Sequence, residues 1–385
     1  MDLIQDNRSM SVQVSYRKQV VFGLMLLLVI LSSIEIISRI VLDERDSCNQ
    51  ALPMSGLYEH LTKSDLKKIC QDYYNNIIQY PLPIIHYEPN QKTDTVTINS
   101  YGFRGEEFEQ EKIDDREYRI FVLGGSVLYG IFATSDNTTI PGYLQEFYND
   151  FTTDRDVRVI NAGVNGHESF AETYLIKNKI IDLNPDLIIV LDGWNDLGAP
   201  LEREYKEPEG IEQLEQYSLV IRKYYKTVQF YEFVERVLEK QIGENKREVY
   251  DSTVDQKSEL WKSRWKEICE LGEKENFKVI ITLQPILGAG NKVLTDWEIR
   301  TTEEYGHINP STSYNFMRDK LNELESSCAV TEDLTNVFDN ETGLIYFDVG
   351  HMGDKGNRII AEKMFKISSP LVTDIQEKTV KISNI

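Results

Sequence analysis

The stretch FVLGGSVLYG, residues 121–130, places a serine directly after two glycines at the end of an apolar run. Phe121, Val122 and Leu123 have the apolar side chains of a buried strand, and the glycines permit a sharp turn. A serine at such a corner is either a turn residue or a nucleophile presented at the end of a strand. The rest of the chain decides between these two interpretations.

Apolar runs of the same kind recur from residue 119 onward, with segments of helical spacing between them. The runs are RIFVLGG (119–125), VRVINAG (157–163), DLIIVLDG (186–193) and FKVIITLQP (277–285), and AVTEDLTNVF (329–338) suggests a further strand. Strands that are apolar on both faces and alternate with helices predict an α/β fold with a parallel sheet covered on both sides. Such a sheet places its chemistry at the carboxyl ends of its strands.

The helical segments are unequal in character. TTIPGYLQEFYND (138–150) and SFAETYLIKNKIIDL (169–183) have apolar residues at helical spacing, and GDKGNRIIAEKMFKI (353–367) predicts a final amphipathic helix. Residues 199–275 are long, charged and helical in pattern, and they separate two strands. We therefore expect a helical insertion over the active face, with aromatic side chains that serve mainly in helix packing.

The N-terminal region predicts a membrane anchor. Residues 20–42 form an apolar stretch long enough to cross a bilayer as a helix, and Arg8, Arg17 and Lys18 lie in the tail before it, residues 1–19. This pattern predicts a cytoplasmic tail, a single span and a large domain outside the cytoplasm, with a cleaved signal peptide as the alternative. Residues 43–114 predict a leader packed on the main domain, residues 115–385, because they are rich in tyrosine and isoleucine.

The charge and the cysteines of the chain limit the classes of partner and the cellular compartment that we expect. The 385-residue chain has a formal net charge of -21, which argues against a nucleic-acid partner because no basic surface is available. None of the four cysteines has the C-x-x-C spacing of zinc or redox motifs. In an oxidising compartment they can form two disulfides, and Cys48 with Cys70 and Cys269 with Cys328 gives the shorter loops among three possible pairings.

A serine nucleophile requires a base that accepts its proton, so Ser126 needs a histidine. His351 follows the apolar run LIYFDVGH and has a carboxylate, Asp348, three residues before it. Asp348 can orient the imidazole and stabilise its charged form during attack. His167 is the competing candidate, but it lacks such a partner in the sequence. The other histidines lie before the sheet or in an irregular stretch: His60, His86 and His307.

Attack on an ester carbonyl also requires fixed donors for the oxyanion. The expected donors are the backbone N–H groups of Ser126 and Gly163 and the side-chain amide of Asn195. Glycine at 163 allows the backbone to approach a substrate closely, and Asn195 is a neutral donor that does not titrate. Both residues lie in motifs that follow predicted strands, NAGVNG (161–166) and GWND (193–196).

With these motifs the chain resembles the SGNH hydrolases, also called the GDSL lipase and esterase superfamily, over about residues 115–368. The four name-giving residues match Ser126, Gly163, Asn195 and His351, and INSYGFRGEEF (98–108) is similar to a leader in membrane-anchored members. The resemblance implies a flavodoxin-like three-layer sandwich that hydrolyses or transfers acyl groups without a metal or cofactor. The first block departs from the usual G-D-S, because Gly125 stands at its middle position.

These observations predict a membrane-anchored serine esterase outside the cytoplasm. Its substrate would be an ester of a small molecule, a glycan or a lipid. Two alternatives remain open at this stage. An O-acyltransferase would use the same acyl-enzyme with a sugar hydroxyl or a lipid as acceptor, and a non-catalytic binding module would keep only the sandwich.

Overall fold

The computed structural model describes residues 15–44, 48, 54–58, 60–73, 77, 79–80, 84–151, 154–201, 253–304 and 310–382. The chain divides into two compact units. One comprises Met1–Asn49 and Gln216–Glu244, and the other comprises Gln50–Glu215 and Asn245–Ile385. The second unit contains the sheet and all the residues of the site described below.

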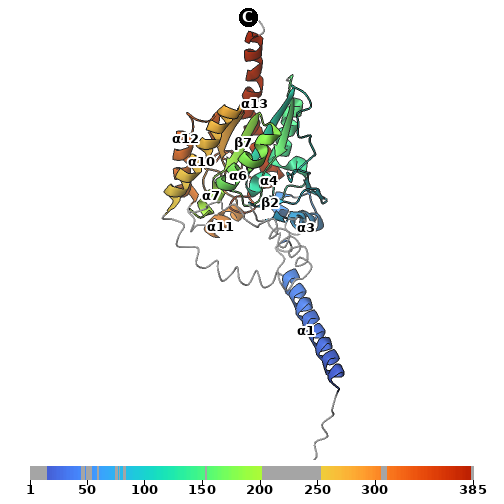
Figure 1. Ribbon diagram of the computed structural model, residues 1–385. Helices are drawn as coiled ribbons and strands as arrows, with labels where there is room; N and C mark the ends of the chain where they lie inside the picture. The colour runs from blue at the N-terminus through green and yellow to red at the C-terminus, as the bar shows by residue number, and fades with distance from the viewer. Residues whose placement is uncertain are drawn as a thin grey trace, which may run out of the picture. The chain divides into compact units, whose positions relative to one another are not determined.

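A five-stranded parallel sheet forms the centre of the second unit (Figure 1). Its strands are β5 (Glu117–Gly124), β6 (Asp156–Asn161), β7 (Leu187–Asp192), β8 (Lys278–Leu283) and β9 (Val330–Asp333). The order β6-β5-β7-β8-β9 places the first strand between the second and the third. In register, Val122 lies opposite Asn161 and Gly124 opposite Leu191, so three strands end side by side. The predicted parallel sheet is confirmed.

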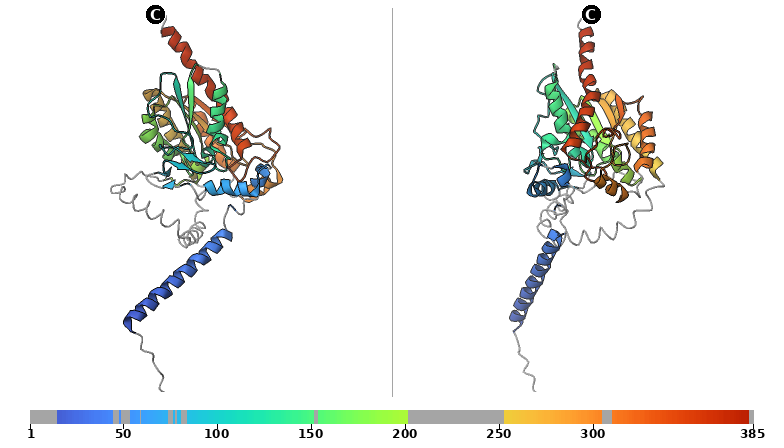
Figure 2. Two further views of the ribbon diagram at one scale, coloured as in Figure 1. Left: turned by 90° about the vertical axis from the view of Figure 1, so that its right-hand side faces the viewer. Right: turned by 180° about the vertical axis from the view of Figure 1, so that it is seen from behind.

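Helices cover both faces of this sheet (Figures 1 and 2). Along β7, Ile188 and Val190 belong to one core, and their neighbours in sequence belong to the other, as expected for a strand buried on both faces. The first core includes residues of α6 (Ser169–Leu175), α10 (Val254–Glu275) and α12 (Pro310–Glu323). The second includes residues of α5 (Ile140–Asp150) and α13 (Asp354–Ile382). The arrangement confirms the three-layer α/β sandwich.

The last part of the predicted insertion is helix α10. It occupies the last part of residues 199–275, lies between β7 and β8 in the chain, and packs against α6 and α12. Trp261 and Trp265 are fully buried in the first core, which confirms the helix-packing interpretation for these two aromatics. α10 is therefore a covering helix of the sandwich, and residues 202–252 of the predicted insertion lie outside the described residues.

The final helix and the leader also contribute to the second unit. Ile360 and Met364 of α13 are fully buried, as the amphipathic pattern predicts, and Ile359 and Phe365 pack partly buried beside them.

The leader contains α2 (Met54–Leu57), α3 (Lys63–Gln71) and four two-residue strands, β1 (Gln79–Tyr80), β2 (His86–Tyr87), β3 (Gln91–Lys92) and β4 (Thr97–Ile98). Its Tyr58 hydroxyl donates to the carbonyl of Phe132 over 2.7 Å.

Helix α1 (Tyr16–Glu44) is the described helix of the first unit. Its stretch Tyr16–Ser38 is long and apolar enough to cross a membrane, with a mean hydropathy of 2.7 and no part of its most apolar window buried. A signal sequence near the N-terminus also passes this test of length and composition. The helix thus overlaps the predicted span, residues 20–42, without distinguishing an anchor from a cleaved segment.

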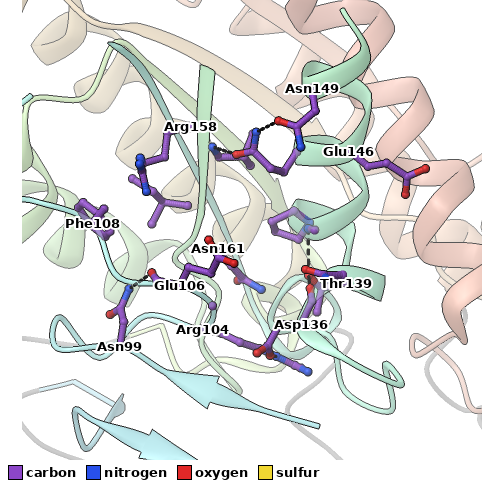
Figure 3. A pocket seen from close by; sticks show the side chains of 17 residues that line it. Asn99, Arg104, Glu106, Phe108, Asp136, Thr139, Glu146, Asn149, Arg158 and Asn161 are labelled. Carbon is purple, nitrogen blue, oxygen red and sulfur yellow. Dashed lines mark hydrogen bonds and ion pairs between the residues drawn. The ribbon is translucent and has the colours of Figure 1, made fainter. Parts of the chain in front are cut away.

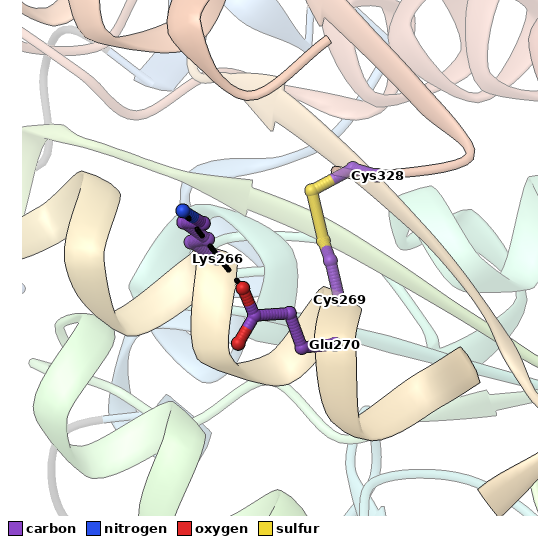
Figure 4. Close-up of a disulfide and its surroundings, with 4 residues drawn as sticks. All are labelled: Lys266, Cys269, Glu270 and Cys328. Atoms are coloured by element: carbon purple, nitrogen blue, oxygen red, sulfur yellow. Dashed lines mark ion pairs between the residues drawn. A yellow bond between two sulfur atoms is a disulfide. The ribbon is translucent and has the colours of Figure 1, made fainter. Parts of the chain in front are cut away.

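All four cysteines are disulfide-bonded. Cys269 of α10 is joined to Cys328, which confirms this pair of the predicted pairing (Figure 4). Cys328 precedes β9 in the chain, so the bond ties a covering helix to the segment that enters an edge strand.

Candidate active site

Ser126 lies at a strand-to-helix corner. It is the first residue of the short helix α4 (Ser126–Tyr129), which Gly125 separates from β5. The corner lies at the carboxyl end of a central strand, where a parallel sheet exposes its functional residues. The first N–H groups of a helix have no acceptor within the helix, so the Ser126 N–H is a donor available to a ligand.

Asp348, His351 and Ser126 form a continuous hydrogen-bonded chain. His351 Nδ1 lies 2.7 Å from Asp348 Oδ2, and His351 Nε2 lies 2.7 Å from Ser126 Oγ. An ionised carboxylate only accepts hydrogen bonds, so Asp348 places the imidazole proton on Nδ1. Nε2 is then free to accept the proton of the serine hydroxyl. The structure thus brings together the three residues that the sequence predicts as a triad.

The loop before α13 fixes the orientation of Asp348. Its Oδ1 atom accepts hydrogen bonds from the backbone N–H groups of Gly350, at 2.9 Å, and His351, at 2.8 Å. Burial alone would raise the pKa of Asp348, but the adjacent imidazole and the two N–H donors outweigh it and lower the pKa below its ordinary value. The carboxylate therefore stays ionised at neutral pH.

The other described histidines have different surroundings. His167 Nε2 donates to the carbonyl of Ile85 over 2.6 Å, and its side chain is buried. His86 Nδ1 lies 2.9 Å from the carbonyl of Ile84, and His60 is exposed. His307 lies outside the described residues. Among the described histidines, therefore, His351 is the one whose ring is hydrogen-bonded to the hydroxyl of Ser126.

Asn195 lies against Gly125. It belongs to α7 (Trp194–Gly198), directly after β7, and its Nδ2 donates to the carbonyl of His167 over 2.6 Å. The second N–H of this amide remains for another acceptor. A Cβ atom on residue 125 would collide with Asn195 Nδ2. The glycine that departs from the usual G-D-S block is therefore the residue that makes room for the asparagine side chain.

Gly163 also packs tightly against the serine corner. A Cβ atom there would approach the backbone nitrogen of Tyr129 to 2.5 Å and the carbonyl carbon of Leu128 to 2.9 Å. The sequence predicts glycine for close approach to a substrate, whereas the structure shows close approach to helix α4. The Gly163 N–H donates to Asn161 Oδ1 over 3.0 Å. An oxyanion would have to share this N–H with Asn161 Oδ1 or replace that atom as its acceptor.

A group of buried carboxyl groups beside α7 is the part of the site that sequence reasoning missed. It comprises Glu168, Glu172, Asp192 and Asp196. Asp196 accepts from both the N–H and the hydroxyl of Ser169, which ties α7 to the start of α6. Burial raises the pKa of Asp192 to about 6 and that of Asp196 well above its ordinary value. The available signal was Asp196 itself, the last residue of the GWND motif that follows a predicted strand.

Two further structural features bear on the chemistry. Within the described ranges, no group of three or more histidine, cysteine, aspartate or glutamate side chains is arranged to hold a metal ion. A pocket of about 450 Å³ is lined in part by Arg104, Asp136 and Asn161 (Figure 3). Neither Ser126 nor His351 lines it.

No protein-family model and no curated protein matches the chain. Among solved structures, an acetyl xylan esterase called AlAXEase is 16% identical with a TM-score of 0.38, and the match covers 65% of this chain and 98% of that one. A GDSL-like lipase from Bacteroides thetaiotaomicron is 12% identical with a TM-score of 0.36, covering 68% and 93%. A catalytic variant of an acetylxylan esterase from Geobacillus stearothermophilus is 14% identical with a TM-score of 0.36, covering 65% and 93%.

These TM-scores all lie below 0.5. The match extends over nearly the whole of each solved structure and about two thirds of this chain. Over that region, the chain is similar to two solved acetylxylan esterases and to a solved GDSL-like lipase.

Proposed function

We propose that this protein is a serine ester hydrolase of the SGNH type. The single observation that carries the proposal is the hydrogen-bonded chain from Asp348 through His351 to Ser126, with 2.7 Å at each of its two links. This hydrogen-bonded triad lies at the carboxyl ends of neighbouring parallel strands, where the Gly163 loop and helix α7 with Asn195 also begin. A turn residue would need neither an imidazole partner nor a carboxylate behind it.

In the proposed reaction, Ser126 Oγ attacks the ester carbonyl while His351 Nε2 accepts the hydroxyl proton. Asp348 stabilises the imidazolium. Collapse of the tetrahedral intermediate breaks the bond to the alcohol, which leaves with the proton that His351 returns. A water molecule then repeats the sequence on the acyl-enzyme, giving the acid and restoring the serine.

The oxyanion would be met by the Ser126 N–H and by the second amide N–H of Asn195. The Gly163 N–H would join them if it turns from Asn161 Oδ1 toward the oxyanion. Each fixed donor of this kind is worth roughly 10²- to 10³-fold in kcat. The reaction needs no metal or cofactor in this scheme.

The proposal extends to location. We place the catalytic domain outside the cytoplasm, anchored by the apolar stretch of α1, because Arg8, Arg17 and Lys18 precede that stretch and the cysteines are disulfide-bonded. Surface glycans or lipids are then accessible ester substrates. Alkaline extraction of membranes distinguishes a membrane anchor from a cleaved signal sequence, since a spanning chain stays in the pellet and a cleaved chain is released.

Hydrolysis of a short-chain p-nitrophenyl ester tests the proposed reaction. Ser126→Ala and His351→Ala are each expected to lower kcat by at least about 10³-fold while the protein remains folded. Ser100→Ala is the matched control, because the Ser100 hydroxyl also donates a 2.7 Å hydrogen bond, but to Glu107 and not to a histidine. Equal turnover by wild type and Ser126→Ala would rule out the assignment.

A further inference from the structure

Arg104 is a buried residue of the leader that contacts the serine corner. It belongs to the YGFRG stretch, and its side chain is 1% exposed. Its Nη1 atom donates to the carbonyl of Tyr129 over 3.1 Å and to that of Gly130 over 2.8 Å. Nε pairs with Asp136 over 2.8 Å in the lining of the pocket that Figure 3 draws, and Nη2 donates to the carbonyl of Thr95.

The two carbonyls at Nη1 belong to the end of helix α4. This helix has four residues and carries Ser126 at its start. The last carbonyls of a helix have no partner within it, and a single turn cannot fix its own geometry. The N–H groups of Gly130 and Ile131 both donate to Ser126 O over 3.1 Å, so the orientation of the serine backbone depends on this end of the corner.

Asn161 links the same end of α4 to the Gly163 loop. Its Nδ2 donates to the carbonyl of Tyr129 over 3.3 Å, and its Oδ1 accepts from the Gly163 N–H over 3.0 Å. Arg104 and Asn161 therefore share one acceptor, the Tyr129 carbonyl. A displacement of the guanidinium would act on the helix that carries the nucleophile and on the loop that carries an oxyanion donor.

The contacts require an arginine and not merely a positive charge. One planar fork donates to three carbonyls and a carboxylate, whereas a lysine ammonium offers three donors from one point. Asp136 also accepts from the N–H of Thr97 over 3.0 Å, which holds the carboxylate in place. The leader thus supplies a rigid, charge-paired support for the corner.

We propose that Arg104 is a positioning residue of the Ser126 site, which holds helix α4 and the Gly163 loop in register for attack. The inference rests on the proposed serine-hydrolase function and extends it to the leader, since the catalytic corner is then incomplete without residues that precede the sheet in the chain.

Arg119 provides a matched control at the opposite end of β5. It is fully buried, pairs with Glu117 over 2.7 Å, and donates to the carbonyls of Glu109, Gln110, Glu111 and Leu183. Arg104 and Arg119 are therefore both buried, charge-paired and bonded to several carbonyls. They differ in location, because β5 begins near Arg119 and ends at the serine corner.

The experiment compares Arg104→Lys with Arg119→Lys in the full chain. Both variants are expected to lower thermal stability by similar amounts. Arg104→Lys is expected to lower kcat for a p-nitrophenyl ester roughly 10- to 100-fold at nearly unchanged KM, because misplacement of the nucleophile by about 1 Å costs this much. Its rate of labelling by a fluorophosphonate should fall by a similar factor, whereas Arg119→Lys should keep both rates.

If Arg104→Lys does not fold, Asp136→Asn tests the same support, since it weakens one hydrogen bond of the guanidinium and leaves the other three in place. It should lower kcat severalfold without changing KM. Wild-type kcat in a folded Arg104→Lys or Asp136→Asn variant, or an equal loss in Arg119→Lys, would overturn the positioning role alone. A wild-type protein that neither hydrolyses the ester nor reacts with the probe would overturn the proposed function as well.

Discussion

Gly125 lies directly before Ser126, and the structure gives a physical reason for a residue without a side chain at this position. The amide of Asn195 fills the space that a side chain at residue 125 would need. The same amide donates to His167 O and offers its second N–H to the proposed oxyanion. At the scale of single residues, the size of the side chain at residue 125 therefore determines whether the Asn195 amide can occupy its position.

This coupling predicts the outcome of adding a single methyl group. Gly125→Ala is expected to displace the Asn195 amide and to lower kcat/KM roughly 10²- to 10³-fold, the effect of losing one oxyanion donor. Asn195→Ala should give a similar loss. The double variant should be little worse than either single one, because both changes remove the same interaction. Losses that multiply in the double variant would contradict the coupling.

At the scale of elements, α10 shows how a covering helix is fixed to the sheet. Trp261 and Trp265 are fully buried, and Trp261 Nε1 donates to Asp192 Oδ2 over 3.1 Å. The disulfide between Cys269 and Cys328 closes a segment with a sequence separation of 59. Cys328 lies shortly before β9 begins, so the bond is at the amino end of that strand and away from the serine corner.

Removing this disulfide should therefore affect stability and spare catalysis. Cys269→Ala with Cys328→Ala is expected to lower the free energy of unfolding by about 4 kcal/mol on the chain-entropy estimate for a loop of this length, with kcat and KM unchanged at 25 °C. Lys266→Ala on the same helix is the control, because its ion pair with Glu270 is 3.8 Å long and exposed (Figure 4). That change should cost no more than ~0.5 kcal/mol. A loss of kcat in the disulfide variant would contradict the separation of the two roles.

The elements also show which features a sequence pattern can predict. The runs that became β5, β7 and β8 are apolar on both faces, and this pattern identifies a strand of a covered parallel sheet. The strands β1 to β4 have two residues each and no periodicity to detect. The sequence pattern predicts α10 as helical but does not separate it from the predicted insertion, because its charged residues continue the charged composition of the segment before it.

Some residues of the candidate site could likewise be predicted from the sequence, and others could not. Ser126, Asp348 and His351 carry distinctive chemistry in short motifs, and the sequence was sufficient to propose them together. The supporting contacts of Arg104, Asn161 and the buried carboxyl groups join segments far apart in the chain. Such contacts depend on tertiary structure, and a single sequence offers no pattern from which to predict them.

At the scale of the whole molecule, buried carboxyl groups link stability to pH. Glu172 is fully buried, and neither of its carboxyl oxygens has a hydrogen-bond partner among the described residues. Burial, followed by the charges of Asp192, Asp196 and Glu168, raises its pKa well above the ordinary value. A carboxyl group with a raised folded-state pKa stabilises the fold below its unfolded-state pKa, and this contribution is lost as pH rises toward the folded-state value.

Glutamine does not titrate, so Glu172→Gln removes the loss of stability that the buried carboxyl group causes as the pH rises. The variant should therefore be more stable than wild type at neutral pH. The gain over wild type in free energy of unfolding is expected to be small near pH 4 and to grow as the pH is raised to 8. Denaturant unfolding at several pH values measures it, with Glu273→Gln, an exposed position of α10, as the control that should show little pH-dependent difference. A gain that does not change with pH would show that Glu172 is not held protonated.

The central claim is that Ser126 is an activated nucleophile, and a fluorophosphonate tests it most directly. The probe reacts with a serine whose hydroxyl proton is accepted by a nearby base, as His351 would do at 2.7 Å. Mass spectrometry of the labelled, full-length protein should locate one adduct on the peptide that contains Ser126, with no adduct in His351→Ala. Absence of an adduct on folded wild-type protein, or an adduct on a different serine, would contradict the account.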